Sequence, residues 1–321
     1  MRIKSNQTTR WVASLFNAII IGVLLISAIG SSYASTNIII YNKKSTYQKK
    51  FYQHLKNKVT TSSINLITLD SSELSEQRIK EHAPSLVISL DKKSPKQLIG
   101  LKLKVPVLHA LLTQSDSKQY LLCQSSCEFK RRKNHFFVLD QPLERQLALI
   151  NLIKPNTKNI GVIYSEQTAN LIKPLEQTAS QFSLNIKPFL TTSDSLGISI
   201  NDMTSSSDVL LALADTNIYN PTTLPQILLN SYRYRIPVIG FSKGFIKAGA
   251  IAGVVSNLSQ LAAQMSEILL DFEAGEAILS NGTIYPKYFS VISNRRVANS
   301  LNLHFPSDHN LTATLKSREI P

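Results

Sequence analysis

The sequence is poor in the residues that build most catalytic and metal sites. Its 321 residues include two cysteines, 11 glycines and six histidines, which are scattered and never paired at metal-ligand spacing. No H-E-x-x-H, G-x-S-x-G, P-loop or G-x-G-x-x-G motif occurs. The few acidic residues do not pair on any predicted face. We therefore expect a protein that is not an enzyme and that uses no cofactor and no metal ion.

The two cysteines, Cys123 and Cys127, lie close together in the stretch LLCQSSCEF. Their spacing is not the C-x-x-C of redox proteins, and a zinc site would need more ligands than these two. An exported chain can keep a disulfide, but a bridge here requires a loop, because it tolerates only a narrow range of Cα separations. The sequence leaves open whether the two thiols are bridged.

The first 34 residues have the order of a secretory signal peptide. A basic leader with Arg2, Lys4 and Arg10 precedes an apolar run at residues 18–29, and a small-x-small cleavage signal ends at Ala34. The run is shorter than the ~20 residues that span a bilayer, and an uncleaved anchor is the alternative. No cysteine lies near the cleavage site, so we do not expect a lipoprotein.

The chain is basic, with a net charge of +14 that includes three positive charges of the leader. The remaining basic residues are scattered apart from one run at residues 130–133, which we interpret as a solvated loop. An exported protein rarely meets nucleic acid, and no platform of aromatic and basic residues is present. We therefore expect no nucleic-acid partner.

Strand and helix patterns alternate along most of the chain, as in a parallel sheet with helices on both faces. This alternation predicts an α/β fold with two doubly wound parallel-sheet lobes. Strands are expected at residues 37–41, 64–69, 86–90, 105–112, 136–139, 159–164, 184–190, 209–214 and 238–241.

The clearest strand–helix–strand unit spans residues 208–242. Its first apolar run, at residues 209–214, ends at the polar turn that begins with Asp215, and its second run ends at Ser242. Ligands of such sheets bind beyond the carboxyl ends of the strands. The polar residues at these two ends are therefore candidate ligand contacts.

The same unit carries a resemblance to a known family. DVLLALADTNIYN, followed by RIPVIGFSKGFIKAGAIA, resembles the substrate-binding proteins of ABC transporters, specifically the family named for tryptophan and tyrosine uptake. The similarity extends to VLDQPLERQLALINLIKPNTKNIGVIYS upstream and to YPKYFSVISNRRVANSLNLHFP downstream. It covers residues 138–306 well and residues 36–137 only in pattern.

This resemblance implies a type I periplasmic-binding fold, in which three crossings between two lobes form a multi-strand hinge. Lobe 1 is expected at residues 35–138 and about 248–278, which includes a returning strand and helix. Lobe 2 is expected at residues 139–247 and about 279–306, followed by a C-terminal tail at 307–321.

The resemblance also implies a function. We expect a monomeric periplasmic protein that captures a small organic ligand, such as an amino acid, by hinge closure and delivers it to an ABC permease in the inner membrane. The alternative is a membrane-tethered or receptor-associated sensor with the same fold. Because the first lobe matches only loosely, the family name does not identify the ligand.

Polar residues at strand ends are the predicted ligand-binding residues. Asp215 is the main candidate, because a buried carboxylate there could pair with a ligand ammonium, although it could also bond only its own turn. The full set is Asp215, Thr216, Asn217, Tyr164, Ser165 and Ser242 in the second lobe, and Ser45, Thr46 and Ser89 in the first.

Overall fold

The computed structural model describes residues 36–62, 64–101, 103–122, 134–276, 278 and 282–319. The predicted signal peptide, both cysteines and the basic run at 130–133 lie outside the described residues. None of the helices in this part of the chain has the length and hydrophobicity that crossing a bilayer requires.

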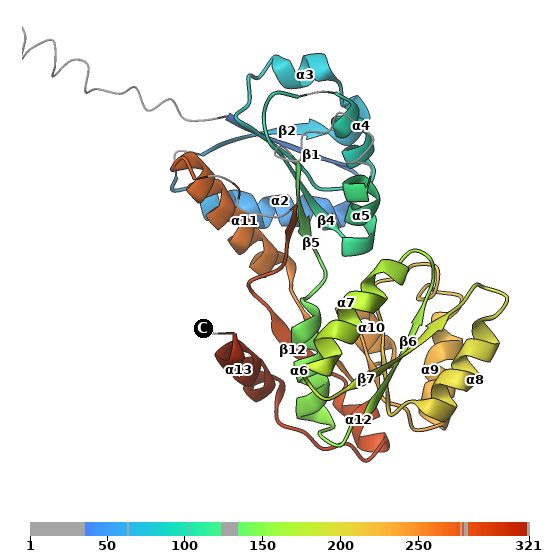
Figure 1. Cartoon of the computed structure of the whole chain (residues 1–321). Coiled ribbons are helices and arrows are strands. Elements are labelled where there is room, and N and C mark those ends of the chain that lie inside the picture. Colours follow the sequence, from blue (N-terminus) through green and yellow to red (C-terminus); the bar gives the residue numbers. More distant parts are fainter. Residues whose placement is uncertain are drawn as a thin grey trace, which may run out of the picture. The chain divides into compact units, whose positions relative to one another are not determined.

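The described residues form two six-stranded sheets with helices on both faces, which confirms the predicted fold class (Figure 1). The first sheet has the order β11-β5-β4-β3-β1-β2, and every neighbouring pair is parallel. Its strands are β1 (Thr36–Tyr41), β2 (Asn65–Asp70), β3 (Leu86–Ser89), β4 (Val107–Leu112), β5 (Asn134–Val138) and β11 (Thr283–Ile284).

The second sheet has the equivalent order β12-β10-β9-β8-β6-β7. Its neighbouring strands are parallel except at one edge, where β12 runs antiparallel to β10. Its strands are β6 (Asn159–Tyr164), β7 (Asn185–Leu190), β8 (Val209–Leu211), β9 (Val238–Ile239), β10 (Ala252–Val255) and β12 (Ser290–Ser293).

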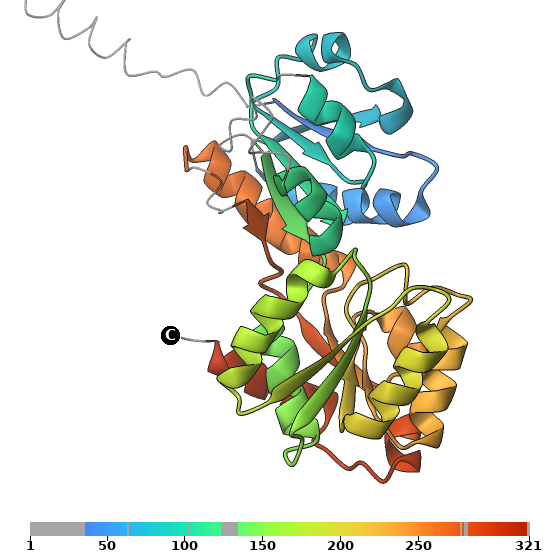
Figure 2. The same ribbon diagram turned by 45° about the vertical axis from the view of Figure 1, so that its right-hand side comes forward.

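Alternate side chains of the first sheet pack into two separate layers, because successive residues of a strand point to opposite faces. Ile39 packs with Phe51 and Leu261 under helices α2 and α11, and Ile38 packs with Ile79 and Leu98 under α3 and α4. Helices α2 and α11 lie side by side in both views (Figures 1 and 2). The first-lobe helices are α2 (Thr46–Val59), η1 (Ser71–Glu73), α3 (Glu76–Lys80), α4 (Ser94–Gly100), α5 (Gln114–Leu122) and α11 (Leu258–Glu273).

The second sheet is covered in the same way. Ile160 packs with Leu147 and Leu175 under α6 and α7, while Ile163 packs with Met203 and Ile227 under α8 and α9. The second-lobe helices are α6 (Leu143–Ile153), α7 (Ala169–Ser180), α8 (Leu196–Ser206), α9 (Leu224–Arg233), α10 (Lys243–Ala248), α12 (Arg295–Ser300) and α13 (Asp308–Arg318).

The chain passes between the lobes at three crossing segments, residues 139–142, 256–257 and 285–289. Two boundaries differ from the expectation. Strand β10 does not return to lobe 1, because it pairs with β9 and β12 of the second sheet; only α11 returns. The last crossing comes later than residue 279, because β11 pairs with β5 of the first sheet.

The C-terminal segment also differs from the expected tail. Helix α13 buries Leu311 and Leu315 in the core of the second lobe, against the side of the sheet that α6 covers. Residues 307–319 therefore belong to lobe 2.

Candidate functional site

A cavity of about 560 Å³ lies where the carboxyl ends of strands from both lobes meet two of the crossing segments. Its volume falls in the range of roughly 300–1,000 Å³ that small-molecule sites occupy. Its lining residues are Tyr47, Thr113, Gln114 and Leu258 of lobe 1; Leu139, Asp140, Gln141, Ser256 and Asn257 at the crossings; and Leu143, Gln146, Leu171, 211–214, 241–244, Val255 and Ile292 of lobe 2.

The lobe 2 side of the cavity has an apolar wall. Leu143 and Leu171 come from helices α6 and α7, and Ile292 comes from β12. Leu211 is the last residue of β8, and Leu213 follows the strand. Strand β8 stops at Leu211, three residues earlier than the apolar run predicted. Residues 212–214 follow the strand and line the cavity.

The charged side chains among the described lining residues are one acid, Asp140, and one base, Lys243. Asp140 follows β5 in the first crossing segment, and its Oδ2 accepts a hydrogen bond of 2.6 Å from the Gln114 backbone N–H. Desolvation raises the pKa of the Asp140 carboxyl to about 6, and the nearby Asp116 acts in the same direction against the Gln114 bond. A cationic partner would offset this cost, because an opposite charge favours the ionised form.

Lys243 is the first residue of α10 and is exposed. Ser242 precedes it as the N-cap, and its Oγ accepts a hydrogen bond of 3.2 Å from the Phe245 backbone N–H. Both residues line the cavity, so Ser242 is a predicted ligand residue that the structure places there.

Asp215 is buried, 1% exposed, and the protein itself satisfies its carboxylate. Oδ2 accepts from the Ser165 backbone N–H at 2.8 Å and from Thr168 Oγ1 at 2.7 Å, and Oδ1 accepts from the Asn217 backbone N–H at 3.0 Å. The Ser165 hydroxyl donates to the carboxylate as well. Asp215 therefore fastens the loop after β6 to the loop after β8, and it is not among the lining residues of the cavity.

The neighbouring predicted residues lie at a contact between the lobes. Gln167 Nε2 donates a 3.4 Å hydrogen bond to Ser115 Oγ of α5, and Gln167 Oε1 accepts from Thr216 Oγ1 at 3.0 Å. Ser115 Oγ also lies 3.5 Å from the Ala214 carbonyl oxygen. The loops that Asp215 joins therefore present Gln167 to the first lobe, while Asn217 Nδ2 donates inward to Ser165 Oγ at 3.1 Å.

Replacing Asp215 with asparagine is expected to lower the free energy of unfolding by about 1–3 kcal/mol, because the amide group would meet one of the donors that now face a carboxylate oxygen. Urea denaturation of the ligand-free protein measures this loss. Asp202→Asn, an exposed acid on α8, is the matched control and should leave stability unchanged. Unchanged stability of Asp215→Asn together with lost ligand affinity would instead support the direct role in ammonium binding that the sequence suggested.

The remaining predicted residues are dispersed. Ser45 caps α2 and accepts from the Gln48 backbone N–H, Thr46 is exposed, and Tyr164 packs at the edge of the second-lobe core. Ser89 is fully buried within β3, where its Oγ lies 2.8 Å from His109 Nδ1.

His109 hydrogen-bonds through both ring nitrogens to buried polar groups of the first lobe. Its Nε2 lies 3.0 Å from Asn134 Oδ1, and burial lowers its pKa to about 4. This arrangement is that of a satisfied core histidine with no exposed nucleophile, since Ser89 and His109 are both 0% exposed. Among the described residues, no three histidine, cysteine or acidic side chains gather as a metal-ion site.

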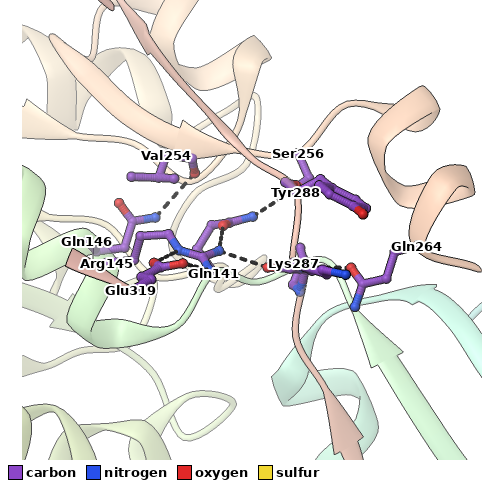
Figure 3. A network of polar contacts seen from close by, with 10 residues as sticks. Gln141, Arg145, Gln146, Val254, Ser256, Gln264, Lys287, Tyr288 and Glu319 are labelled. Atoms are coloured by element: carbon purple, nitrogen blue, oxygen red, sulfur yellow. Dashed lines mark hydrogen bonds and ion pairs between the residues drawn. The ribbon is translucent and has the colours of Figure 1, made fainter. Parts of the chain in front are cut away.

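A network of polar contacts joins the three crossing segments (Figure 3). Arg145 of α6, 6% exposed, donates from Nη1 to Gln141 Oε1 at 2.5 Å and to the Pro286 carbonyl at 2.9 Å. Its Nε and Nη2 donate to the two carboxylate oxygens of Glu319, just after α13, at 2.5 and 2.8 Å. Its guanidinium also lies 4.0 Å from the centre of the Phe289 ring.

The same network reaches the middle crossing. Gln141 Nε2 donates to Ser256 Oγ at 2.9 Å, and the Ser256 hydroxyl donates to the Tyr288 carbonyl at 2.5 Å. Gln264 holds the third crossing through both ends of its amide, to Tyr285 O at 2.9 Å and from Lys287 N at 2.6 Å. Arg145 thus bonds the first and third crossing segments directly, and Gln141 and Ser256 extend the network to the middle one.

Comparisons with known proteins agree with this architecture. The family model described as ABC transporter substrate binding protein matches residues 74–308. A tyrosine-binding protein of Clostridioides difficile is 22% identical over 140 residues, which cover 42% of this chain and 40% of that protein; the match therefore spans less than half of the relative.

Solved structures share the fold. A ligand-free, open substrate-binding protein with adhesive properties from Clostridium difficile has a TM-score of 0.63 at 16% identity, over 86% of this chain and 97% of that chain. An ABC domain from Streptococcus pneumonia in complex with L-Trp has a TM-score of 0.55 at 14% identity, over 87% of this chain and 98% of that chain.

Proposed function

The chain belongs to the ABC transporter substrate-binding protein family, and from this premise we propose that it is a periplasmic carrier of a zwitterionic amino acid with a large apolar side chain. It releases the ligand to an ABC permease of the inner membrane. The observation that carries the proposal is the cavity, which both lobes line and which contains one carboxylate and one ammonium beside an apolar wall.

The two charged residues suit the two charges of an amino acid. Asp140 supplies a partly buried carboxylate for the ligand ammonium, and a hydrogen bond between charged groups of this kind contributes ~1.5–3 kcal/mol. Lys243 and the Ser242 hydroxyl supply donors for the ligand carboxylate. Asp140 therefore takes the role that the sequence suggested for Asp215, whose oxygens already accept hydrogen bonds from the protein.

The apolar wall supports a large ligand side chain. Burying an aromatic or branched side chain against Leu143, Leu171 and Leu211 contributes ~25 cal/mol for each Å² removed from water. The ligands named for two related proteins, tyrosine and L-Trp, have side chains of this size.

Ligand capture proceeds by closure of the lobes about the three crossing segments. Contacts from Gln114 and Tyr47 on one lobe and from Lys243 on the other reach a ligand together only when the lobes are close. A ligand that binds the closed form better shifts the population towards it. The permease then recognises the closed form, with no covalent chemistry.

A panel of amino acids tests this proposal by thermal shift on the chain that begins at Ser35. At a concentration of ~100 Kd, a cognate ligand should add about 2.7 kcal/mol to the free energy of unfolding and raise Tm by several degrees. The matched controls are the methyl ester and the α-hydroxy acid of each hit, which lack the carboxylate and the ammonium respectively. A panel without any stabilising member would contradict the proposal. An ester and a hydroxy acid that stabilise the protein as much as the parent amino acid would contradict it as well.

A further inference from the structure

Gln146 differs from the other glutamines near the crossing segments. Gln141, Gln260 and Gln264 each use both ends of the side-chain amide, with an acceptor for Nε2 and a donor for Oε1. Gln146 donates a single long bond of 3.5 Å from Nε2 to the Val254 carbonyl. Its Oε1 has no hydrogen-bond partner among the described residues.

The side-chain amide of Gln146 lies beside the apolar wall of the cavity. Gln146 is 7% exposed, lines the cavity and follows Leu143 by one helical turn of α6. Figure 3 shows its nitrogen directed at Val254 and its oxygen turned away from the Arg145 network. A buried acceptor without a donor is costly, because it has lost its bond to water and gained none from the protein.

We propose that Gln146 determines specificity by accepting a hydrogen bond from an N–H or O–H group on the apolar side chain of the ligand. The proposal rests on the proposed function and deepens it. In the ligand-free protein Oε1 is shielded from water, so the amide must turn towards the cavity to reach the ligand. The one contact that this turn breaks among the described residues is the weak bond to Val254.

The consequence is a preference within the class of large apolar amino acids. A ligand with a donor on its ring gives Oε1 the partner that it lacks, whereas a ligand of the same shape without that donor buries the acceptor unpaired. Sites built to bond a ligand donor reject the analogue that lacks it more strongly than an apolar pocket rejects a change of one methylene. We expect at least roughly tenfold tighter binding of the donor-bearing member.

Two ligand pairs test the proposal by calorimetric titration: L-tyrosine against L-phenylalanine, and L-tryptophan against L-3-benzothienylalanine, in which sulfur replaces the indole N–H. Wild-type protein should bind the first member of at least one pair ten times more tightly. Gln146→Leu should bind both members of that pair equally, and its ligand-free Tm should rise, because an unpaired buried amide has been removed. Gln146→Met, which is unbranched like glutamine, replaces the leucine variant if that variant folds poorly.

Ser231→Ala is the matched control. Ser231 is a fully buried residue of α9 whose Oγ also has no partner among the described residues, but it does not line the cavity. Its replacement should raise Tm and leave the ligand preference intact. A preference that survives in Gln146→Leu, or equal binding of both members by wild-type protein, would overturn the role of Gln146 while leaving the carrier function standing. Failure of all four ligands to bind would overturn the role of Gln146, and the carrier function would fall only if the whole amino-acid panel also failed to stabilise the protein.

Discussion

Asp140→Asn is expected to make the ligand-free protein more stable at pH 8 and to weaken binding of an amine-bearing ligand at least tenfold. The loss of affinity follows from the loss of a charged hydrogen bond, which contributes ~1.5–3 kcal/mol. The gain in stability follows from desolvation, because asparagine places no charge in the cavity and its carbonyl oxygen still accepts the Gln114 N–H.

The sign of the stability change follows from the raised pKa. The Asp140 carboxyl has a pKa of about 6 in the folded protein against its ordinary value of 3.8, so between these values the folded chain holds a proton that the unfolded chain releases. This contribution is present below about pH 4 and is lost as the pH rises through 6. The Tm advantage of Asp140→Asn should therefore appear above pH 6 and vanish below about pH 4.

Ligand affinity should depend on pH in the opposite direction. A ligand ammonium requires the ionised Asp140, so wild-type affinity should fall roughly tenfold for each pH unit below 6, whereas Asp140→Asn should show no such slope. Asp116 of α5 and Tyr285 of the third crossing interact electrostatically with this carboxyl, and Lys243 of α10 lines the same cavity.

Thermal melts and calorimetric titrations between pH 4 and 8 measure both effects. Glu144→Gln is the control, because Glu144 is an exposed acid four residues along the chain that does not line the cavity. It should change neither quantity. Wild-type affinity in Asp140→Asn, or a lower Tm at pH 8, would contradict the assignment of Asp140.

Arg145→Met is expected to lower the free energy of unfolding on the order of 3 kcal/mol, the largest stability loss that we predict. Methionine fills similar space, but it leaves Gln141 Oε1 and the Pro286 carbonyl without their donor and removes the cation from the Phe289 ring. Removing one partner of a buried charged pair typically costs ~3–5 kcal/mol. Glu319 reduces the loss, because its side chain is 40% exposed and can turn to water.

Urea denaturation of Arg145→Met and Glu319→Gln separates the parts of this network. Glu319→Gln keeps the guanidinium bonds to Gln141 and Pro286 and should cost less than Arg145→Met, because Glu319 itself is 40% exposed. A loss within 1 kcal/mol of wild type in Arg145→Met would show that the three crossing segments hold their arrangement without the guanidinium.

The alternation of strands and helices predicted the two lobes, because each buried apolar run must end at a polar turn. It did not predict the sheet to which β10 belongs. A run such as AIAGVV is buried on both faces in either lobe, and what places it is its antiparallel pairing with β12, about 40 residues later. The C-terminal helix was missed for a related reason, since Leu311 and Leu315 are isolated apolar residues whose partners lie on α6.

The rule that ligands bind at strand ends pointed to Asp215, which does not line the cavity, and to Ser242, which does. Asp215 does follow its strand, but Ser165 and Thr168, about 50 residues earlier in the chain, satisfy its carboxylate. Asp140 was not among the predicted ligand residues, because its place in the cavity depends on Gln114 and on groups from the other lobe. An isolated acid in a crossing segment is the sequence signal that would have indicated it.

The return of α11 to the first lobe has a consequence for how the protein is made. Phe51 and Leu55 of α2 are covered by Leu261 and Met265 of α11, about 200 residues later in the chain. While the nascent polypeptide is shorter than that, the N-terminal half has an apolar helix face without its cover and an edge strand, β5, without β11. The first lobe cannot complete its core before almost the whole polypeptide has been synthesised.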